Sequence, residues 1–355
     1  MTKIELGLGL ETWSSRHAEL PIDWIRRAEA LGFHSVWSAE AYGADALVPL
    51  AHVAAHTRRI GLATGLLQVS ARPAVTAAMS LATLARLAPG RAIIAGLGVS
   101  GPQVVEGWYG QPWGRPLTRL REYVEVMRLA WARQGPVGFD GREIQLPYRG
   151  PGASGLGKPL KPILHAPPGI EIWPAGGGPR AVAQAAEIGD GWLPMGFRPG
   201  MMSTYRRELE AGLARRADGM TFERFKIWPI LPVVLARDVR AALDALKPGI
   251  ALLVGGYGAK EKNFHVQQMA RCGFAEEAER IQALWLAGHR DEAIRAVPDD
   301  YPDSTRLIGP TARIRERWLP WSRAGATGYT IYTQSLEALE LMAELAGTRD
   351  DACAV

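Results

Sequence analysis

A glycine turn between an apolar strand and an amphipathic helix is the stretch of this chain best suited to chemistry. Residues 170–173 are apolar except for one glutamate, and residues 180–188 have the apolar spacing of a helix. Between them, residues 176–178 are three consecutive glycines, whose backbone N–H groups are open to a ligand. The N-terminus of the helix adds a partial positive charge. The turn is therefore suited to binding a phosphate.

A second glycine loop follows the next expected strand. Residues 192–195 have the pattern of a short strand, and the loop at residues 196–200 begins and ends with glycine. Two consecutive strands therefore end in loops that can face one anion. The alternative is that the turn at residues 176–179 is only a tight connection between strand and helix.

Strands and helices alternate along most of the chain, which is the pattern of an α/β protein. We expect strands at residues 4–10, 33–39, 59–66, 91–97, 170–173, 192–195, 225–236 and 326–333. We expect helices at residues 21–31, 46–57, 73–87, 116–133, 180–188, 202–217 and 336–346. Eight strand and helix units predict a closed parallel barrel, the (β/α)8 TIM barrel.

Two segments interrupt this alternation. Residues 134–169, after the fourth strand, are rich in Gly and Pro and contain one possible hairpin at residues 138–146. Residues 238–308, between the seventh and eighth strands, contain several helical segments and are too long for a connecting loop. We expect this helical insertion to lie over the barrel mouth or in an oligomer contact, with core packing as the alternative. Both insertions would belong to one barrel domain spanning residues 1–355.

Candidate site residues follow the expected strands, because the active site of such a barrel lies at the C-terminal strand ends. Glu11 and Trp13 follow the first strand, and Glu40 and Tyr42 follow the second. The third to sixth strands are followed by residues 65–70, 98–103, 176–179 and 195–198. Aromatic side chains, two carboxylates and an anion site therefore converge at one end of the barrel.

Residues 96–101 also satisfy the dinucleotide-binding pattern GxGxxG after a strand. The signal is weak, because Pro102 directly follows the last glycine and the unit is the fourth rather than an opening one. A dinucleotide-binding turn at this place stays open as an alternative.

Composition restricts the class of protein. The 355 residues include 41 Lys and Arg against 36 Asp and Glu, and the basic residues are scattered, which favours a small anionic ligand over nucleic acid. No apolar run approaches the roughly 20 residues of a membrane span, and no signal peptide precedes the first strand. The two cysteines, Cys272 and Cys353, imply no disulfide framework, and no metal-ligand spacing is visible. We therefore expect a cytoplasmic protein without a metal or a membrane partner.

Several blocks of sequence, taken in order, resemble one known family. They are residues 39–43 (AEAYG), 71–74 (ARPA), 96–108 (GLGVSGPQVVEGW) and 186–194 (AEIGDGWLP). These blocks are similar to the luciferase-like monooxygenase superfamily, and within it to the oxidoreductases that use the deazaflavin coenzyme F420. The likeness runs from residue 4 to residue 345 and includes residues 254–258 and 262–264 of the late insertion.

The resemblance implies a deazaflavin lying across the strand ends of a TIM barrel. It places a non-prolyl cis peptide at Gly65-Leu66, as a bulge behind the ring, and the cofactor phosphate on the turn after the fifth strand. Arg198 or Arg180 would supplement the charge there, with a solvated arginine as the alternative. The cofactor-binding residues that it implies are Gly65, Leu66, Leu67, Gly98, Ser100, Ala175, Gly176, Gly177, Gly178, Pro179, Gly196 and Phe197.

The chemistry implied is hydride transfer between coenzyme F420 and a small or medium-sized unsaturated substrate, with C=O, C=N or activated C=C as the reacting bond. A general acid must then supply a proton, and the candidates are Glu40 and Glu11, whose pKa burial among aromatic side chains would raise. For Glu40 the alternative is a structural hydrogen bond to the neighbouring loop. The aromatic residues expected to line the substrate pocket are Trp13, Tyr42, Trp108 and Tyr257.

Two alternative functions stay open. One is a monooxygenase of the same fold that uses reduced FMN and oxygen, and the other is a barrel that binds a cofactor or partner without turnover. Several deazaflavin enzymes carry His beside an acid after the second strand, whereas this chain has Ser38-Ala39-Glu40, which counts against a sugar-phosphate dehydrogenase. A homodimer acting on a small molecule is expected in the enzymatic cases.

Overall fold

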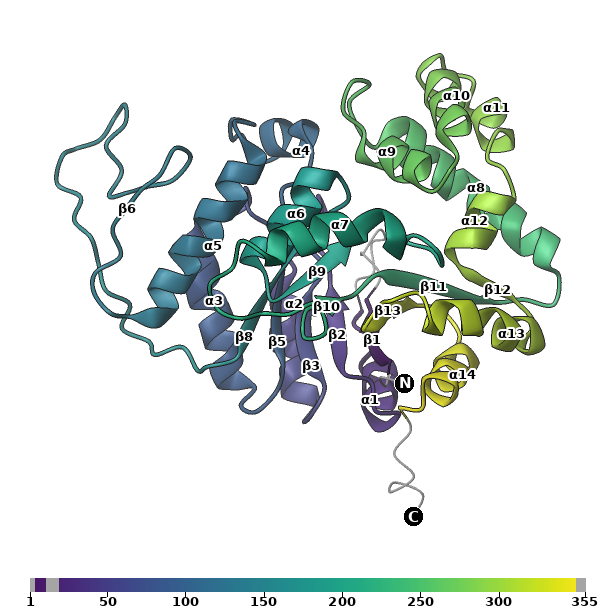
Figure 1. Ribbon diagram of the computed structural model, residues 1–355, viewed down its shortest axis with the longest axis horizontal. Helices are drawn as coiled ribbons and strands as arrows, with labels where there is room; N and C mark the ends of the chain where they lie inside the picture. The colour runs from purple at the N-terminus through teal and green to yellow at the C-terminus, as the bar shows by residue number, and fades with distance from the viewer. Residues whose placement is uncertain (1–3, 11–18, 349–355) are drawn as a thin grey trace.

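The computed structural model describes residues 4–10 and 19–348, and its parallel strands form the expected barrel (Figure 1). Their order begins β10-β9-β8-β5-β3-β2-β1-β13-β11. Only Trp228 and Pro229 separate β10, which pairs with β9, from β11, which pairs with β13, so the sheet returns on itself. The strands are β1 Glu5–Gly9, β2 Ser35–Ser38, β3 Gly61–Thr64, β5 Ile93–Gly98, β8 Ile170–Gly176, β9 Gly191–Pro194, β10 Lys226–Ile227, β11 Ile230–Leu235 and β13 Gly328–Tyr332.

Two short strands extend this sheet. β4 (Leu67–Gln68) pairs with the end of β5, and β12 (Leu307–Gly309) pairs with β11. Neither was expected from the sequence, because a strand of two or three residues carries almost no periodic signal.

Helices cover the outside of the strands (Figure 1). The expected ones are present within a few residues of their expected ends, and α4 and α13 are additional. The helices are α1 Ile22–Ala30, α2 Leu47–His56, α3 Ala74–Leu87, α4 Pro102–Gly107, α5 Pro116–Ala132, α6 Pro179–Ile188, α7 Met202–Leu213, α13 Thr311–Ser322 and α14 Leu336–Ala346. No helix in the described part of the chain is long and apolar enough to cross a membrane.

The early insertion contains the expected hairpin, far from the late insertion (Figure 1). β6 (Phe139–Asp140) and β7 (Gln145–Leu146) pair antiparallel. Glu122 of α5 stabilises the hairpin turn. Its carboxylate accepts hydrogen bonds from the backbone N–H groups of Arg142, Glu143 and Ile144, each at 2.8 Å.

The late insertion is helical, as expected, and runs from β11 to β12. It comprises α8 Val239–Gly256, α9 Phe264–Arg271, α10 Ala275–Leu286, α11 Arg290–Arg295 and α12 Asp300–Thr305. Asn263 begins α9, since its side-chain oxygen accepts from the backbone N–H of His265 at 2.8 Å. Side chains of α9 and α12 line a cavity together with strand-end residues of the barrel, so these two helices lie over the barrel mouth.

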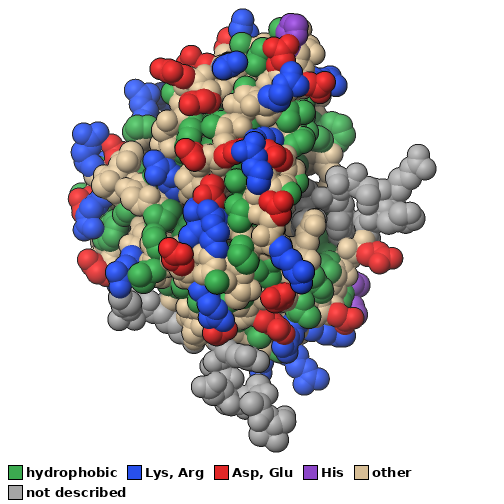
Figure 2. All heavy atoms as spheres, turned by 90° about the vertical axis from the view of Figure 1, so that its right-hand side faces the viewer, with side chains coloured by type: hydrophobic (Ala, Val, Ile, Leu, Met, Phe, Trp, Pro, Cys, Tyr) green, Lys and Arg blue, Asp and Glu red, His purple; other side chains and the backbone are tan. Residues whose placement is uncertain are grey.

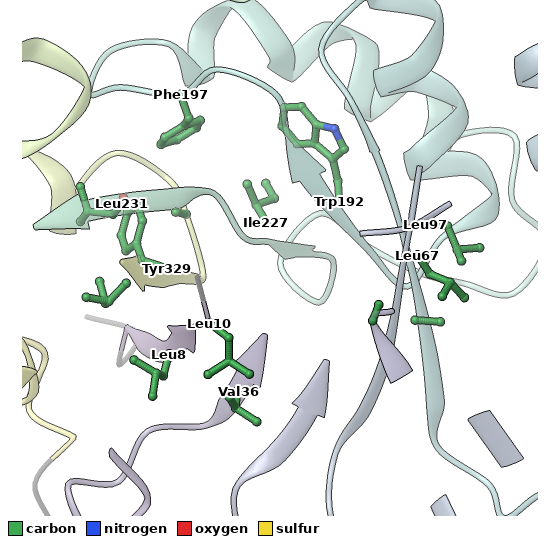
Figure 3. Packing of buried hydrophobic residues seen from close by; sticks show 14 of the residues in the cluster. Leu8, Leu10, Val36, Leu67, Leu97, Trp192, Phe197, Ile227, Leu231 and Tyr329 are labelled. Atoms are coloured by element: carbon green, nitrogen blue, oxygen red, sulfur yellow. The ribbon is translucent and has the colours of Figure 1, made fainter. Parts of the chain in front are cut away.

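Three tryptophans fill the barrel interior. Trp37, Trp173 and Trp228 are at most 2% exposed, and their ring centroids lie 5.5 to 5.8 Å apart. Glycines on neighbouring strands provide the space: a Cβ on Gly7 or Gly328 would collide with the indole of Trp37 or Trp228. A separate and larger core lies between the strands and the outer helices, and Figure 3 shows part of it, including Leu67 beside Leu97.

Candidate active site

One cavity of about 330 Å³ lies at the C-terminal strand ends, which is a volume suited to a small ligand. Five of the sequence-predicted cofactor residues line it: Gly65, Leu66, Ala175, Gly196 and Phe197. Its other barrel residues are Trp37, Leu193, Pro194, Met195, Trp228, Ile230, Pro232, Thr330 and Tyr332, and its residues from the late insertion and the segment after it are His265, Gln268, Tyr301, Thr305 and Arg306.

The peptide bond Gly65-Leu66 is cis, which confirms the expectation for the turn after the third strand. Gly65 N–H donates to the carbonyl of Ser38 at 2.7 Å, and the carbonyl of Leu66 accepts from Glu40 N–H at 3.0 Å. These bonds join the turn to the end of β2. Leu67, the next predicted residue, is fully buried and pairs with Leu97, so its side chain belongs to the core.

Gly96 and Gly98 are explained by close packing against the end of β3 and this turn. A Cβ on Gly96 would collide with the carbonyl oxygen of Thr64, and one on Gly98 would collide with the side chain of Leu66. Both glycines belong to β5, which ends at Gly98, and Gly101 is the N-cap of α4, so packing accounts for the first two glycines of the GxGxxG pattern without a dinucleotide. Ser100 follows β5 with φ at 56°, and it does not line the cavity.

The glycine turn joins β8 to α6 as expected. β8 ends at Gly176, Gly178 is the N-cap of α6, and Pro179 is its first residue. A Cβ on Gly178 would have no neighbouring atom within 4 Å, so space is open in front of the helix N-terminus. The ten-residue helix directs its unpaired N–H groups and its positive dipole end toward this space.

One arginine, Arg271, borders the glycine turn. The guanidinium of Arg271 lies against Gly177, where an added Cβ would collide with it, and its Nη2 donates to the carbonyl of Met195 at 3.1 Å. The Nε atoms of Arg271 and Arg198 are buried and lack a hydrogen-bond partner within the described residues. Arg180, the other arginine considered from the sequence, is exposed. Buried donors without acceptors are costly, so this arrangement favours an added anion.

Glu40 lies in a network at the end of β2. Its Oε1 pairs with Arg72 Nη2 at 2.5 Å, and its Oε2 accepts from the backbone N–H of Gln68 at 3.0 Å. Arg72 also pairs with Asp45 at 2.7 Å. Burial raises the pKa of Glu40 against the lowering effects of the Gln68 N–H and Arg72. The structural hydrogen bond considered for Glu40 is therefore present, and Glu40 does not line the cavity.

Aromatic side chains predicted for the substrate pocket form a chain toward the cavity. Tyr42 stacks on Tyr257 at 5.6 Å and meets the edge of Trp108 at 6.5 Å. Tyr257 in turn contacts the ring of His265 at 5.3 Å, and His265 lines the cavity. None of these three predicted side chains lines the cavity itself, and Tyr42 and Trp108 are 55% and 63% exposed.

Glu11 and Trp13, the remaining candidates, lie outside the described residues. Several polar residues of the late insertion line the cavity and were not predicted from the sequence. They are His265, Gln268, Tyr301, Thr305 and Arg306. The only signal near them was the family likeness at residues 262–264. Burial lowers the pKa of His265, which favours its neutral form. Among the described residues no group of three or more His, Cys, Asp or Glu is placed to hold a metal ion.

Comparisons with known proteins agree with this geometry. The family model described as luciferase-like monooxygenase matches residues 11–328. A Mycobacterium tuberculosis protein, provisionally named a coenzyme F420-dependent oxidoreductase, is 40% identical, and the match covers 96% of this chain and 99% of the relative. A 5,10-methylenetetrahydromethanopterin reductase of Archaeoglobus fulgidus is 27% identical over 86% of each chain.

A solved structure is similar in fold. The coenzyme F420-dependent tetrahydromethanopterin reductase of Methanopyrus kandleri superposes with a TM-score of 0.75 at 22% identity, covering 96% of this chain and 98% of that one. This likeness supports the barrel topology and carries no residue roles by itself.

Proposed function

The chain belongs to the luciferase-like monooxygenase family, and from this premise we propose that it is an oxidoreductase that uses coenzyme F420. The observation that carries the proposal is the glycine turn with its buried, unsatisfied arginine donors, at one side of a cavity that reaches the Gly65-Leu66 bulge. The relative from Mycobacterium tuberculosis, alike over nearly its whole length, supports the choice of cofactor.

The residues present fit a phosphate-bearing cofactor. Gly177, Gly178 and the first turn of α6 would hold the phosphate, with Arg271 and Arg198 supplying donors beside it. Gly65 and Leu66 would support the ring, and the apolar indoles of Trp37 and Trp228 would exclude water from it. When bound, the deazaflavin supplies hydride chemistry to an unsaturated substrate.

Two side chains of this protein are candidates for transferring the proton that accompanies hydride transfer. Of the two carboxylic acids predicted from the sequence, Glu40 is the one that the structure describes, and burial raises its pKa. His265 lies in the cavity wall itself, and burial favours its neutral form, which can accept a proton and must be protonated before it can donate one. We propose Glu40 as the proton donor and His265 as its alternative.

Glu40→Gln tests this role. If Glu40 donates the proton, turnover should fall about 100-fold or more, because the amide cannot protonate the product, while the dissociation constant of the cofactor stays near the wild-type value. Steady-state kinetics and a cofactor titration measure the two quantities, and His265→Gln serves as the matched comparison.

A different result is expected if Glu40 only anchors the loop after β3. Loss of the ion pair with Arg72 alone would lower thermal stability and cofactor affinity together and leave the turnover number of the loaded enzyme unchanged. Glu40 would then be an anchor of the loop after β3, and the proton would have to come from another group.

A titration with two cofactors tests the proposed function as a whole. Purified protein is titrated with oxidised coenzyme F420 and, separately, with FMN, and binding is followed by cofactor fluorescence. We expect tight binding of F420 and weak binding of FMN, because FMN carries the phosphate but lacks the long anionic tail of F420, which basic side chains around the cavity would attract. A preference for FMN would instead assign the chain to the oxygen-using monooxygenases of the family.

Binding without turnover is the remaining alternative. Intact F420 affinity with no hydride transfer to any acceptor, and no effect of changing Glu40, would indicate a cofactor-binding barrel that is not catalytic. A homodimer and a cytoplasmic location stay predictions from the sequence. Figure 2 shows acidic and basic side chains intermingled on one face, which does not favour nucleic acid as a partner there.

A further inference from the structure

Arg306 places a positive charge in the cavity wall without a carboxylate to balance it. Its Nη1 donates to the hydroxyl of Thr305 at 2.8 Å, and within the described part of the chain it forms no salt bridge. The nearby carboxylate of Asp303 is already occupied, because Arg313 and Arg317 pair with its Oδ2 at 2.9 and 2.8 Å.

The surroundings of Arg306 are unfavourable for an unpaired cation. Part of its surface is accessible from the cavity, while protein atoms enclose the guanidinium closely enough that burial lowers its pKa. A guanidinium nevertheless stays protonated at neutral pH. Among the described residues that line the cavity none is Asp or Glu, and much of the wall is apolar, including Leu66, Trp228 and Ile230. An anion entering from solvent would offset the desolvation of this charge.

Arg306 comes from a different part of the chain than the arginine beside the glycine turn. Leu307, the next residue, pairs with Val233 of β11, so Arg306 stands beside Pro232 on the β11 side of the cavity. Arg271, in contrast, lies against Gly177 after β8. The two positive charges are thus supplied by different elements, Arg271 by α9 and Arg306 by the segment between α12 and β12, and both are close enough to Cys272 to counter the rise that burial causes in its pKa.

We propose that Arg306 binds an anionic group of the substrate, and that the substrate is an otherwise apolar carboxylate. The inference rests on the proposed function, since it takes the cavity as the place where cofactor and substrate meet. The planar guanidinium can donate two parallel hydrogen bonds to a carboxylate. The hydrogen bond from its Nη1 to the hydroxyl of Thr305 holds the guanidinium in one orientation. The aromatic and aliphatic wall would accept the remainder of the molecule.

The test compares two non-reacting probes of equal shape, cyclohexanecarboxylate and cyclohexanecarboxamide. Their binding to the F420-loaded protein and to the protein without cofactor is measured by calorimetry, for wild type, Arg306→Gln and Arg317→Gln. Arg317 is the matched control, because it is an arginine of the same region that pairs with Asp303 and does not line the cavity. We expect wild type and Arg317→Gln to bind the carboxylate about tenfold or more tightly than the amide. Arg306→Gln should lose this preference.

Two further readouts separate substrate recognition from other roles. Arg306→Gln should leave the F420 dissociation constant unchanged, and it should melt at the same or a higher temperature, because it removes an unpaired and partly desolvated charge. Arg306→Lys, a second variant that keeps the charge without the fork, should retain part of the preference.

The results that would overturn the inference are equally definite. They are equal affinity of wild type for the two probes, a carboxylate preference that survives Arg306→Gln, or a tenfold loss of F420 affinity in that variant. Failure of wild type to bind F420 would refute the proposed function instead, and the probe titrations of the cofactor-free protein would still decide the role of Arg306.

Discussion

Replacing Gly178 with aspartate is expected to weaken binding of the phosphate-bearing cofactor about tenfold to a hundredfold without destabilising the fold. Gly178 is the N-cap of α6, with φ at −77° and ψ at 153°, a conformation that aspartate adopts readily. An added Cβ meets no atom within 4 Å. Aspartate is a preferred N-cap residue, so the free energy of unfolding should rise by about a few tenths of a kcal/mol. The same carboxylate would occupy and repel the phosphate position.

The choice of Gly178 rather than Gly177 matters for this experiment. At Gly177 a new side chain would collide with Arg271 and with the carbonyl of Met195, so lost binding there would mix charge with steric damage. Gly178→Asn is the matched control, because asparagine caps a helix equally well and has nearly the same size without the charge. An F420 titration of both variants measures the cofactor affinity, and a thermal melt measures the stability. Equal affinities of Gly178→Asp and wild type would exclude the turn from the cofactor site.

Removing the indole of Trp173 is expected to lower the free energy of unfolding by about 3–5 kcal/mol. Trp173 is 1% exposed and packs against Trp37 and Trp228 inside the barrel. Trp173→Ala would leave a cavity beneath both neighbours and take away the N–H that donates to Glu171 Oε2 at 2.8 Å. Because Trp37 and Trp228 line the active-site cavity, F420 affinity should fall as well.

Denaturant unfolding of three variants checks this result. Trp173→Phe should lose less stability than Trp173→Ala, because most of the ring volume stays. Trp108→Ala, at a tryptophan that is 63% exposed, should change the free energy of unfolding by less than about 0.5 kcal/mol. Similar losses for Trp173→Ala and Trp108→Ala would show that the three indoles do not form a stabilising core.

The barrel was predictable because each of its main strands is a local signal. A parallel strand buried on both faces is a short apolar run bounded by turn residues, and residues 93–98 are an example. The glycine turn was predictable for the same reason, since strand, glycines and helix are contiguous. The cis peptide at Gly65-Leu66 was predictable only through the family resemblance.

The sequence by itself determined the class of fold, the family and the turn suited to a phosphate, because these depend on residues that are neighbours in the chain. The tertiary structure alone decided which charged groups meet in the cavity. Arg271 reaches Gly177 and Arg306 reaches Pro232 of β11 only after the late insertion folds over the strand ends. It also decided that the carboxylate of Glu40 pairs with Arg72 rather than lining the cavity. Such contacts join residues tens of positions apart, and no local pattern records them.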